Sequence, residues 1–499
     1  MKSTVKTVSF MMIATLFSKV AGLLRDVFIA AKYGTESMEA VAYSYASSLP
    51  IQLFDFTLGA AVLATFIPIF NSYMEKGDRT RAYEFSNNFI SITVLISTTI
   101  CVLGMLFSKQ IGLFVAPDVD NTTQELIQKL IIIVLPTTIF TTLAYSFVGI
   151  LQSLGEFNIP AIISMVSNVV IIGYLLFFDN VYGLCIAMLV GWAMQFVIQI
   201  PSLVKKRYSF KLSFDFKDDG IKEAMILALP ILVSSWVQPI SLFVNKRYAS
   251  SILGGGPALD YANRFYIIVV GVFVLAITNY IFPALSKKAG VNDESGFNDI
   301  LLTSIRVMFL IITPIMVGMF LLAEDIVMLV YGRGEFDENS VFLTASALRF
   351  FSVGMIAYGI NEILNKCFYS MKNAKLPMIA SFAGIIVSVI LSALSVNVWN
   401  LGVMGLAFSS SISIYVVAII LFLFIQHKNK FMNVSVVTHM LKVFVAVALM
   451  ATFIFVIKPY VSEFNVILRL LIIVAGGGII YATCLFALKV KEVREVIRK

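Results

Sequence analysis

The chain has 499 residues, of which 59% are hydrophobic and only 13% are charged, and its mean hydropathy is +0.92. Soluble domains carry about 25% charged residues, so this composition excludes an ordinary water-soluble protein and indicates an integral membrane protein. The net charge of +8 does not predict a nucleic-acid partner, because the basic residues gather in short connectors between apolar runs. The four cysteines and two histidines show no disulfide or metal-site spacing, and we expect no bound cofactor.

Apolar runs long enough to cross a bilayer recur along the whole chain. About 14 runs approach the roughly 20 residues that a membrane helix needs, which predicts an all-α membrane protein. The second run, Tyr43–Tyr73, is long enough to be tilted or bent. The approximate centres of the runs are Val20, Ala60, Val94, Leu135, Val169, Val190, Val237, Phe273, Leu310, Met355, Ile386, Ser413, Val447 and Val474.

Charge in the connectors predicts the orientation. Basic residues gather in alternate connectors and in the C-terminal tail, and the connectors between them carry mostly acidic residues. Because cytoplasmic loops are enriched in Lys and Arg, we expect a multi-pass protein of the bacterial inner (plasma) membrane with both termini in the cytoplasm.

A long basic connector, Lys205–Ile221, divides the spans near the middle of the chain. The first two spans of each half share charged residues and a proline, Pro50 and Pro283, which indicates two lobes related by a pseudo-twofold axis along the membrane normal. We predict a six-helix N-terminal lobe over residues 1–210, a six-helix C-terminal lobe over 211–432, and two additional membrane helices with a basic tail over 433–499.

Charged side chains inside the first two spans need an explanation, because ionisable groups in a span usually face a cavity or a partner. Lys19, Gly22 and Asp26 share one face of the first helix by their spacing, and Arg25 lies beside that face. Asp55 in the second span is a candidate partner for Lys19 or Arg25. One interpretation is a cationic cavity for a phosphate-bearing substrate, and the other is a set of structural ion pairs.

The same two interpretations apply to the seventh and eighth spans. Arg264 and Asn263 begin the eighth span, and we expect Arg264 to face the cavity with Arg25. For Lys246 and Arg247, at the end of the seventh span, both interpretations remain open. We expect the charged residues of later spans to be structural or to reach the headgroups: Arg306, Arg349, Glu362 and Lys366.

Two prolines, Pro230 and Pro239, lie within the seventh span. Proline removes a backbone donor and kinks a helix, so we expect a bent gating helix, with a static kink as the alternative. No nucleotide-binding or hydrolase motif appears in the sequence. We therefore expect a transporter and not an enzyme, driven by an ion gradient or by the membrane potential.

Several segments resemble the MviN/MurJ-type lipid II flippases of the multidrug/oligosaccharidyl-lipid/polysaccharide exporter superfamily. The similarity covers nearly the whole chain, and the joint occurrence of its motifs is specific. They are FSKVAGLLRDVFIAAKYG (Phe17–Gly34), GILQSLGEFNIPA (Gly149–Ala161), the segment Asn245–Phe273, FPALSKK (Phe282–Lys288), YGRGEFDENS (Tyr331–Ser340) and CFYSMKNAKLP (Cys367–Pro377).

The resemblance implies a central cavity between the lobes, alternating access, and transport of lipid II, the undecaprenyl-pyrophosphate-linked peptidoglycan precursor used in cell wall biogenesis. By motif match, Lys19, Arg25 and Arg264 would bind its pyrophosphate; the first position is commonly Arg in the family. The second span departs from the family, because LPIQLFDFTLGAA (Leu49–Ala61) lacks the basic residues common after its LP motif. Some members bind sodium, and Asn245 is the candidate ligand here, although the eleventh span offers no Asp.

Other functions remain open. The missing cations of the second span favour a second hypothesis, export of another undecaprenyl-linked oligosaccharide such as O-antigen or exopolysaccharide. A cation-coupled multidrug antiporter would be expected to have acid-lined lobes, and a membrane glycosyltransferase would need large catalytic loops. In each transport reading the partners are a polyprenyl-linked saccharide and membrane lipids, with the cell-wall synthesis machinery as a further candidate.

Overall fold

The computed structural model describes residues 2–59, 65–291, 293–371, 373, 375–429, 434–490 and 492. All the regular elements in these ranges are helices, which confirms the predicted all-α fold. Contacts group the chain into two compact units, Met1–Pro257 and Ala258–Lys499. The lobes predicted over 1–210 and 211–432, and the terminal helix pair over 433–499, stay predictions.

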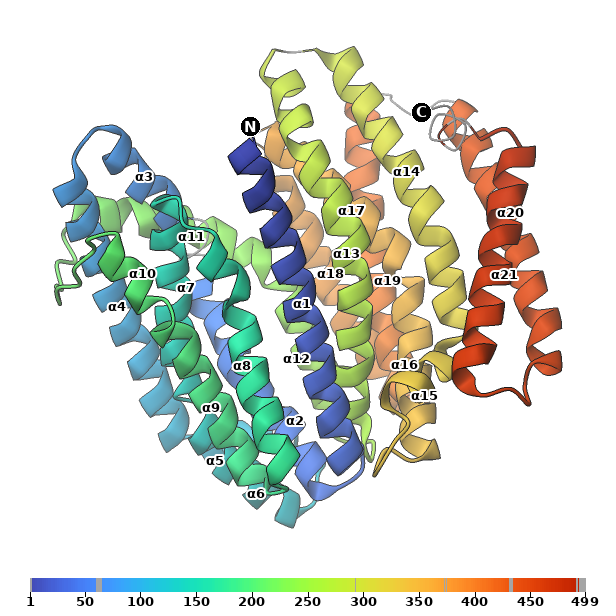
Figure 1. The fold of residues 1–499 in the computed structure, drawn as a ribbon, viewed down its shortest axis with the longest axis horizontal. Helices are drawn as coiled ribbons and strands as arrows, with labels where there is room; N and C mark the ends of the chain where they lie inside the picture. Colours follow the sequence, from blue (N-terminus) through green and yellow to red (C-terminus); the bar gives the residue numbers. More distant parts are fainter. Residues whose placement is uncertain are drawn as a thin grey trace. The chain divides into compact units, whose positions relative to one another are not determined.

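The first unit is built around the contacts of α1 with α8, α2 with α6, and α4 and α9 with α7 (Figure 1). Two clusters of buried apolar side chains fill its interior. Its elements are α1 (Lys2–Tyr33), α2 (Met38–Phe54), the π-helix η1 (Asp55–Gly59), α3 (Ile67–Glu75), α4 (Arg79–Leu106), α5 (Ser108–Val115), α6 (Asn121–Val134), α7 (Thr137–Ser153), α8 (Asn158–Phe177), α9 (Val181–Val197), α10 (Ile200–Lys205), α11 (Asp219–Ser235) and α12 (Val237–Ala249).

The second unit packs α19 against α16, α17 and α18, and packs α14 against α17 and α20. Helices α20 and α21 lie side by side as a hairpin (Figure 1) and share an apolar core with α14. Its elements are α13 (Gly255–Gly290), which begins before the division, α14 (Glu294–Leu321), α15 (Ala323–Tyr331), α16 (Glu338–Val353), α17 (Met355–Ser370), α18 (Lys375–Asn397), α19 (Gly402–Asn429), α20 (Val434–Tyr460) and α21 (Val466–Ala487).

Acidic residues of the connectors cap the helices that follow them. Asp78 accepts from the backbone N–H of Arg81 at 2.9 Å, and Asp120, Asp293 and Asp337 cap α6, α14 and α16 in the same way. A carboxylate at this position satisfies an otherwise unpaired N–H and faces the positive end of the helix dipole. These acids therefore fix the starts of helices, in addition to any effect on membrane orientation.

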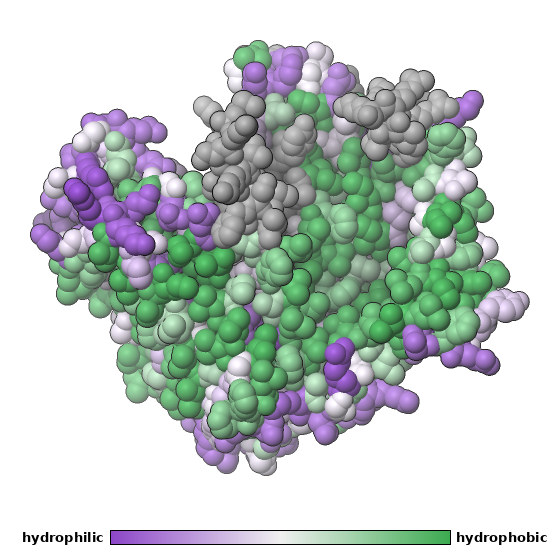
Figure 2. All heavy atoms as spheres, viewed as in Figure 1, coloured by the Kyte–Doolittle hydropathy of each residue, from purple (hydrophilic) through white to green (hydrophobic). Residues whose placement is uncertain are grey.

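Ten helices in the described ranges are long and apolar enough to cross a membrane, or eleven if the bent pair α16–α17 counts as one span. The remaining three predicted spans fall on α1, on α2 with η1, and on α11 with α12, so the count of 14 stays a prediction. Large apolar side chains on these helices are exposed, such as Phe177 at 79% and Phe455 at 77%. Figure 2 shows apolar residues along the sides of the helices and hydrophilic residues at their ends, as lipid requires.

Candidate functional site

The predicted charged face of α1 lies at its contact with α8. The Arg25 side chain donates from Nη1 to Asn168 Oδ1 at 3.0 Å, and from Nη2 and Nε to Asp26 Oδ1 at 2.7 and 3.0 Å. Asn168 in turn donates to the carbonyl of Ser18 at 3.4 Å. A Cβ on Gly22 would lie 3.5 Å from the Asn168 amide nitrogen, so Gly22 leaves room for this network.

These contacts hold the Arg25 guanidinium close to the helix surface. The Arg25 side chain is 19% exposed and the Asp26 side chain is 8% exposed, so a charge-assisted pair lies largely away from solvent. Lys19 is half-buried on the same helix, about 9 Å earlier along the axis at 1.5 Å per residue.

The partner of Arg25 in the structure differs from the candidate partner Asp55. No ion pair joins Asp55 to Lys19 or Arg25 in the described part of the chain, and Arg25 pairs with Asp26, its neighbour in sequence. Asn168 was not singled out, although an amide in the middle of the apolar run Asn158–Phe177 is a signal that a buried hydrogen bond is needed.

The second and seventh predicted spans are both interrupted, and the interrupted segments contact each other. Helix α2 ends at Phe54, and η1 continues from Asp55 as one turn of π-helix, a feature that often marks functional sites. Helix α11 contacts η1, and the Trp236 indole N–H donates to the Phe56 carbonyl at 3.0 Å. The run Tyr43–Tyr73 thus changes from α-helix to π-helix at η1, while its expected tilt or bend stays a prediction; residues 60–64 lie outside the described residues.

The seventh span is broken between its two prolines. Helix α11, which contains Pro230, ends at Ser235, and α12 starts at Val237, with Pro239 in its first turn. Proline at this position has no N–H and its ring clashes with the carbonyl four residues earlier, which interrupts the helix near Trp236. The helix is therefore interrupted between its two prolines, while the bent gating helix and hinging at Pro230 and Pro239 stay predictions.

The end of α12 is fastened to α2 and α5. Buried Lys246 donates from Nζ to the Ser44 carbonyl at 2.6 Å and to Ser48 Oγ at 3.1 Å, and the Tyr45 hydroxyl donates to the Lys246 carbonyl at 2.8 Å. Arg247 donates to the Phe114 carbonyl, and its guanidinium lies 4.9 Å from the centre of the Phe114 ring. These contacts favour the structural interpretation for both cations.

The remaining predicted site residues are Asn245, Asn263 and Arg264. Asn245 is buried near the end of α12, Asn263 is half-buried on α13, and Arg264 is exposed on α13. Arg264 belongs to the second unit and Arg25 to the first, so their shared cavity stays a prediction. Within the described residues, no group of three His, Cys, Asp or Glu side chains could hold a metal ion; a sodium site at Asn245, which would use other oxygens, stays a prediction.

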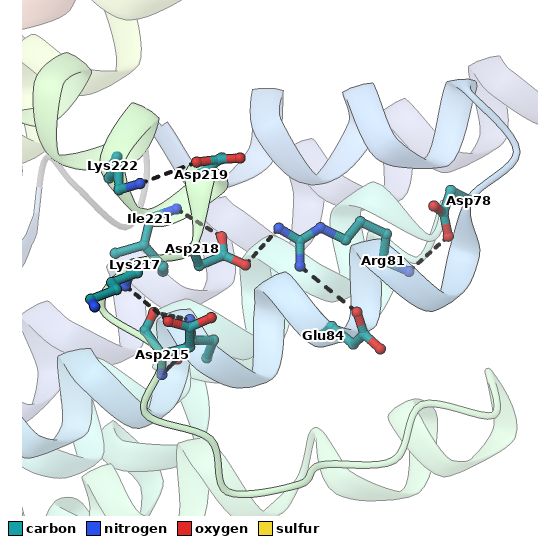
Figure 3. Close-up of polar contacts among 10 residues, drawn as sticks. Asp78, Arg81, Glu84, Asp215, Lys217, Asp218, Asp219, Ile221 and Lys222 are labelled. Atoms are coloured by element: carbon teal, nitrogen blue, oxygen red, sulfur yellow. Dashed lines mark hydrogen bonds and ion pairs between the residues drawn. The ribbon is translucent and has the colours of Figure 1, made fainter.

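The N-terminus of α11 is anchored to α4 by a buried ion pair (Figure 3). Arg81 Nη2 lies 2.7 Å from Asp218 Oδ2, and the Asp218 side chain is only 4% exposed. The other Asp218 oxygen accepts from the backbone N–H of Ile221 at 3.1 Å. The same carboxylate therefore caps α11 and ties the start of the seventh span to α4.

Known proteins match this chain in sequence and in fold over most of its length. The family model described as "Lipid II flippase MurJ" matches residues 29–475. A "Probable lipid II flippase MurJ" of Buchnera aphidicola subsp. Schizaphis graminum is 26% identical over 494 residues, covering 96% of each chain. A solved structure of "Lipid II flippase MurJ, inward closed conformation" has a TM-score of 0.80 at 24% identity, covering 98% of this chain and 99% of that one.

A more distant fold neighbour is an inward-facing multidrug resistance MATE family transporter of the MOP superfamily. It has a TM-score of 0.72 at 16% identity and covers 85% of this chain and 97% of its own. At this identity the likeness concerns the fold alone.

Proposed function

Because the chain belongs to the lipid II flippase MurJ family, we propose that it moves lipid II from the inner to the outer leaflet by alternating access. The observation that carries this proposal is the family match over residues 29–475, which takes in nearly all of the predicted spans. As a multi-pass membrane protein of a bacterial family, it would reside in the inner membrane with both termini in the cytoplasm. Reagents that modify cysteines from one side only, applied to labelled loops, test that orientation.

The cations of α1 support a role in headgroup binding. Arg25 lies inside α1, a predicted membrane span, and its guanidinium is oriented by Asp26 and Asn168. A pyrophosphate replacing Asp26 would keep the bond to Asn168 and gain bidentate contacts from Arg25. Lys19 and Arg264 would supply the remaining positive charge as the lobes close around the headgroup.

The transport cycle needs no covalent chemistry by the protein. An ion gradient or the membrane potential would drive it, with Asn245 as a candidate sodium ligand. Moving one charge across 100 mV corresponds to about 2.3 kcal/mol, enough to bias a two-state transporter appreciably. Comparing transport in vesicles with a sodium gradient, a proton gradient or a potential alone would identify the driving force.

A second candidate substrate is another undecaprenyl-linked oligosaccharide. It is favoured by the aromatic residues that stand in the second span where the family commonly has basic ones. Phe54 is buried and stacks on Tyr145 with 5.4 Å between ring centroids, and Phe56 packs edge-on against Trp236. These side chains make the region near Asp55 apolar, so it adds no positive charge for a diphosphate.

Complementation separates these functions. The wild-type chain should restore growth to a strain depleted of its lipid II flippase, and Arg25→Ala and Arg264→Ala should each abolish rescue without loss of membrane insertion. Arg349→Ala is the matched control, because this arginine pairs at 3.1 Å with Glu324, whose side chain is 59% exposed, and such pairs contribute little. Rescue of a capsule-export mutant but not of the flippase-depleted strain would favour the second substrate; growth of both cavity variants would overturn the headgroup mechanism.

A further inference from the structure

The central connector, residues 206–218, lies against the first half of α4. Helix α10 ends with Arg207 in the left-handed region at φ 59° and with the Tyr208 N–H donating to the Leu203 carbonyl at 3.0 Å, which is a Schellman ending. The chain then runs along a row of polar α4 side chains. The Asn88 amide exchanges two hydrogen bonds with the Asp215 backbone, at 2.6 and 2.7 Å.

Further bonds keep the same edge of the connector on α4. Ser213 N–H donates to Ser91 Oγ at 3.1 Å, and the Asn87 amide donates to the Ser209 carbonyl at 3.4 Å. The Arg81–Asp218 pair closes the far end (Figure 3). The backbone of Ser209, Ser213 and Asp215 is thus bonded to α4, and these bonds hold the connector on that helix.

The connector also carries exposed apolar side chains. Phe210 is 44% exposed, Leu212 70%, Phe214 46% and Phe216 53%. A row of four large apolar side chains on a polar connector marks an interaction surface.

Basic residues are interleaved with this apolar row. Lys205, Arg207, Lys211 and Lys217 are exposed, and the only acid between residues 205 and 217 is Asp215. The acids that follow are already paired, Asp218 with Arg81 and Asp219 with Lys222. The surface is therefore apolar and positively charged, the combination that favours the interface of an anionic bilayer.

The connector also lies where the lipid-facing helices end. The span Val181–Lys205 ends at the residue before the connector, and Val204 before it and Ile226 after it are 65% and 73% exposed. An apolar groove of about 380 Å³ opens between α4 and α11 next to its end, lined by residues such as Phe89, Ile221 and Met225. The apolar row thus continues the lipid-facing surface at headgroup depth.

We propose that Phe210, Leu212, Phe214 and Phe216 insert into the headgroup region of the membrane, and that the flanking Lys and Arg side chains bind anionic phospholipid. The connector then acts as an interfacial anchor that holds α4 and the start of α11 at a fixed depth. This anchor does not depend on which substrate is transported or in which direction.

A spin label on Leu212→Cys tests the proposal in the full chain. Cys101, Cys185 and Cys367 are buried, so a Cys484→Ser background removes the most accessible native thiol. Label depth is measured in nanodiscs of phosphatidylethanolamine alone or with one quarter phosphatidylglycerol, from its relative accessibility to oxygen and to a water-soluble nickel chelate. A label on Lys76→Cys, an exposed residue before α4, is the aqueous reference.

The label at position 212 should favour oxygen at least about threefold more than the label at 76, and phosphatidylglycerol should increase this preference. Replacing Lys205, Arg207, Lys211 and Lys217 with Gln should remove the lipid dependence, since each surface cation favours an anionic bilayer by about fivefold. Gln at the exposed Lys76, Lys222, Lys287 and Lys375 is the matched control and should preserve it.

Three results would overturn the proposal. The first is equal nickel accessibility at positions 212 and 76 in discs with phosphatidylglycerol. The second is the same loss of lipid dependence in both glutamine variants. The third is dipolar coupling between labels at 212 that disappears on dilution with unlabelled protein, which would assign the surface to a second copy of the chain.

Discussion

The Asp26→Asn substitution should weaken the fold while it strengthens substrate binding. Removing one member of a buried ion pair costs about 3–5 kcal/mol. Arg25 is 19% exposed and would keep its bond to Asn168, and the new amide still offers an oxygen, so we expect a loss of about 2 kcal/mol of unfolding free energy. The carboxylate that competes with phosphate for the guanidinium is lost as well, so the affinity for a polyprenyl diphosphate should rise about tenfold, which is 1.4 kcal/mol.

The assay combines thermal unfolding of the purified protein in nanodiscs with titration of lipid II into the same discs. Asp55→Asn is the control, because it removes a carboxylate that makes no ion pair in the described part of the chain and should not tighten binding. Weaker or unchanged lipid II binding by the Asp26 variant would refute the reasoning that phosphate and Asp26 share one guanidinium.

Three further predictions concern the helix contacts. Asp325 of α15 is 5% exposed and pairs with Lys458 of α20 at 3.1 Å and with Arg469 of α21 at 2.6 Å. Asp325→Asn should cost about 3 kcal/mol, seen as a lower unfolding temperature, while Glu463→Gln in the connector between α20 and α21 should leave that temperature unchanged. Lys246→Met removes two hydrogen bonds to α2 and should cost about 1–2 kcal/mol, seen as faster hydrogen exchange in α12. The hydrogen bond from Lys288, and then the one from the Gly296 N–H, lower the pKa of Asp293 to about 2. The carboxylate cap of α14 is therefore fully present above pH 4 and is lost as the pH falls toward 2. Infrared titration of the carboxylate band, with Asp293→Asn as the reference, should show a midpoint near that low pKa.

The sequence predicted local features better than partners. The shared face of Lys19, Gly22 and Asp26 and the break in the seventh span follow from helix periodicity and proline chemistry, which act within a few residues. The pairing of Arg25 with Asn168 joins residues 143 positions apart, and no local rule selects that contact. The sequence does not decide between the functional and the structural interpretation of Lys246 for the same reason, because its partners lie on a helix about 200 residues earlier.

The central connector shows the same limit. The length and basic charge of the connector can be read from the sequence, and they indicate a division of the predicted spans into two halves. Its attachment to α4 depends on the polar row Asn87, Asn88 and Ser91, which in sequence resembles any polar start of a span. The exposure of Phe210, Leu212, Phe214 and Phe216 depends on that attachment and on the packing of α10 and α11, which no local pattern encodes.

The central claim is that Arg25 contacts the diphosphate of the transported lipid. Solid-state NMR on protein with isotope-labelled arginine, loaded with lipid II in a bilayer, measures dipolar coupling between guanidinium carbons and phosphorus. Such coupling should appear at hydrogen-bonding range in the wild-type chain, diminish in Arg25→Lys and persist in Arg349→Lys. Coupling that Arg25→Lys leaves unchanged, at equal lipid II occupancy, would contradict the account.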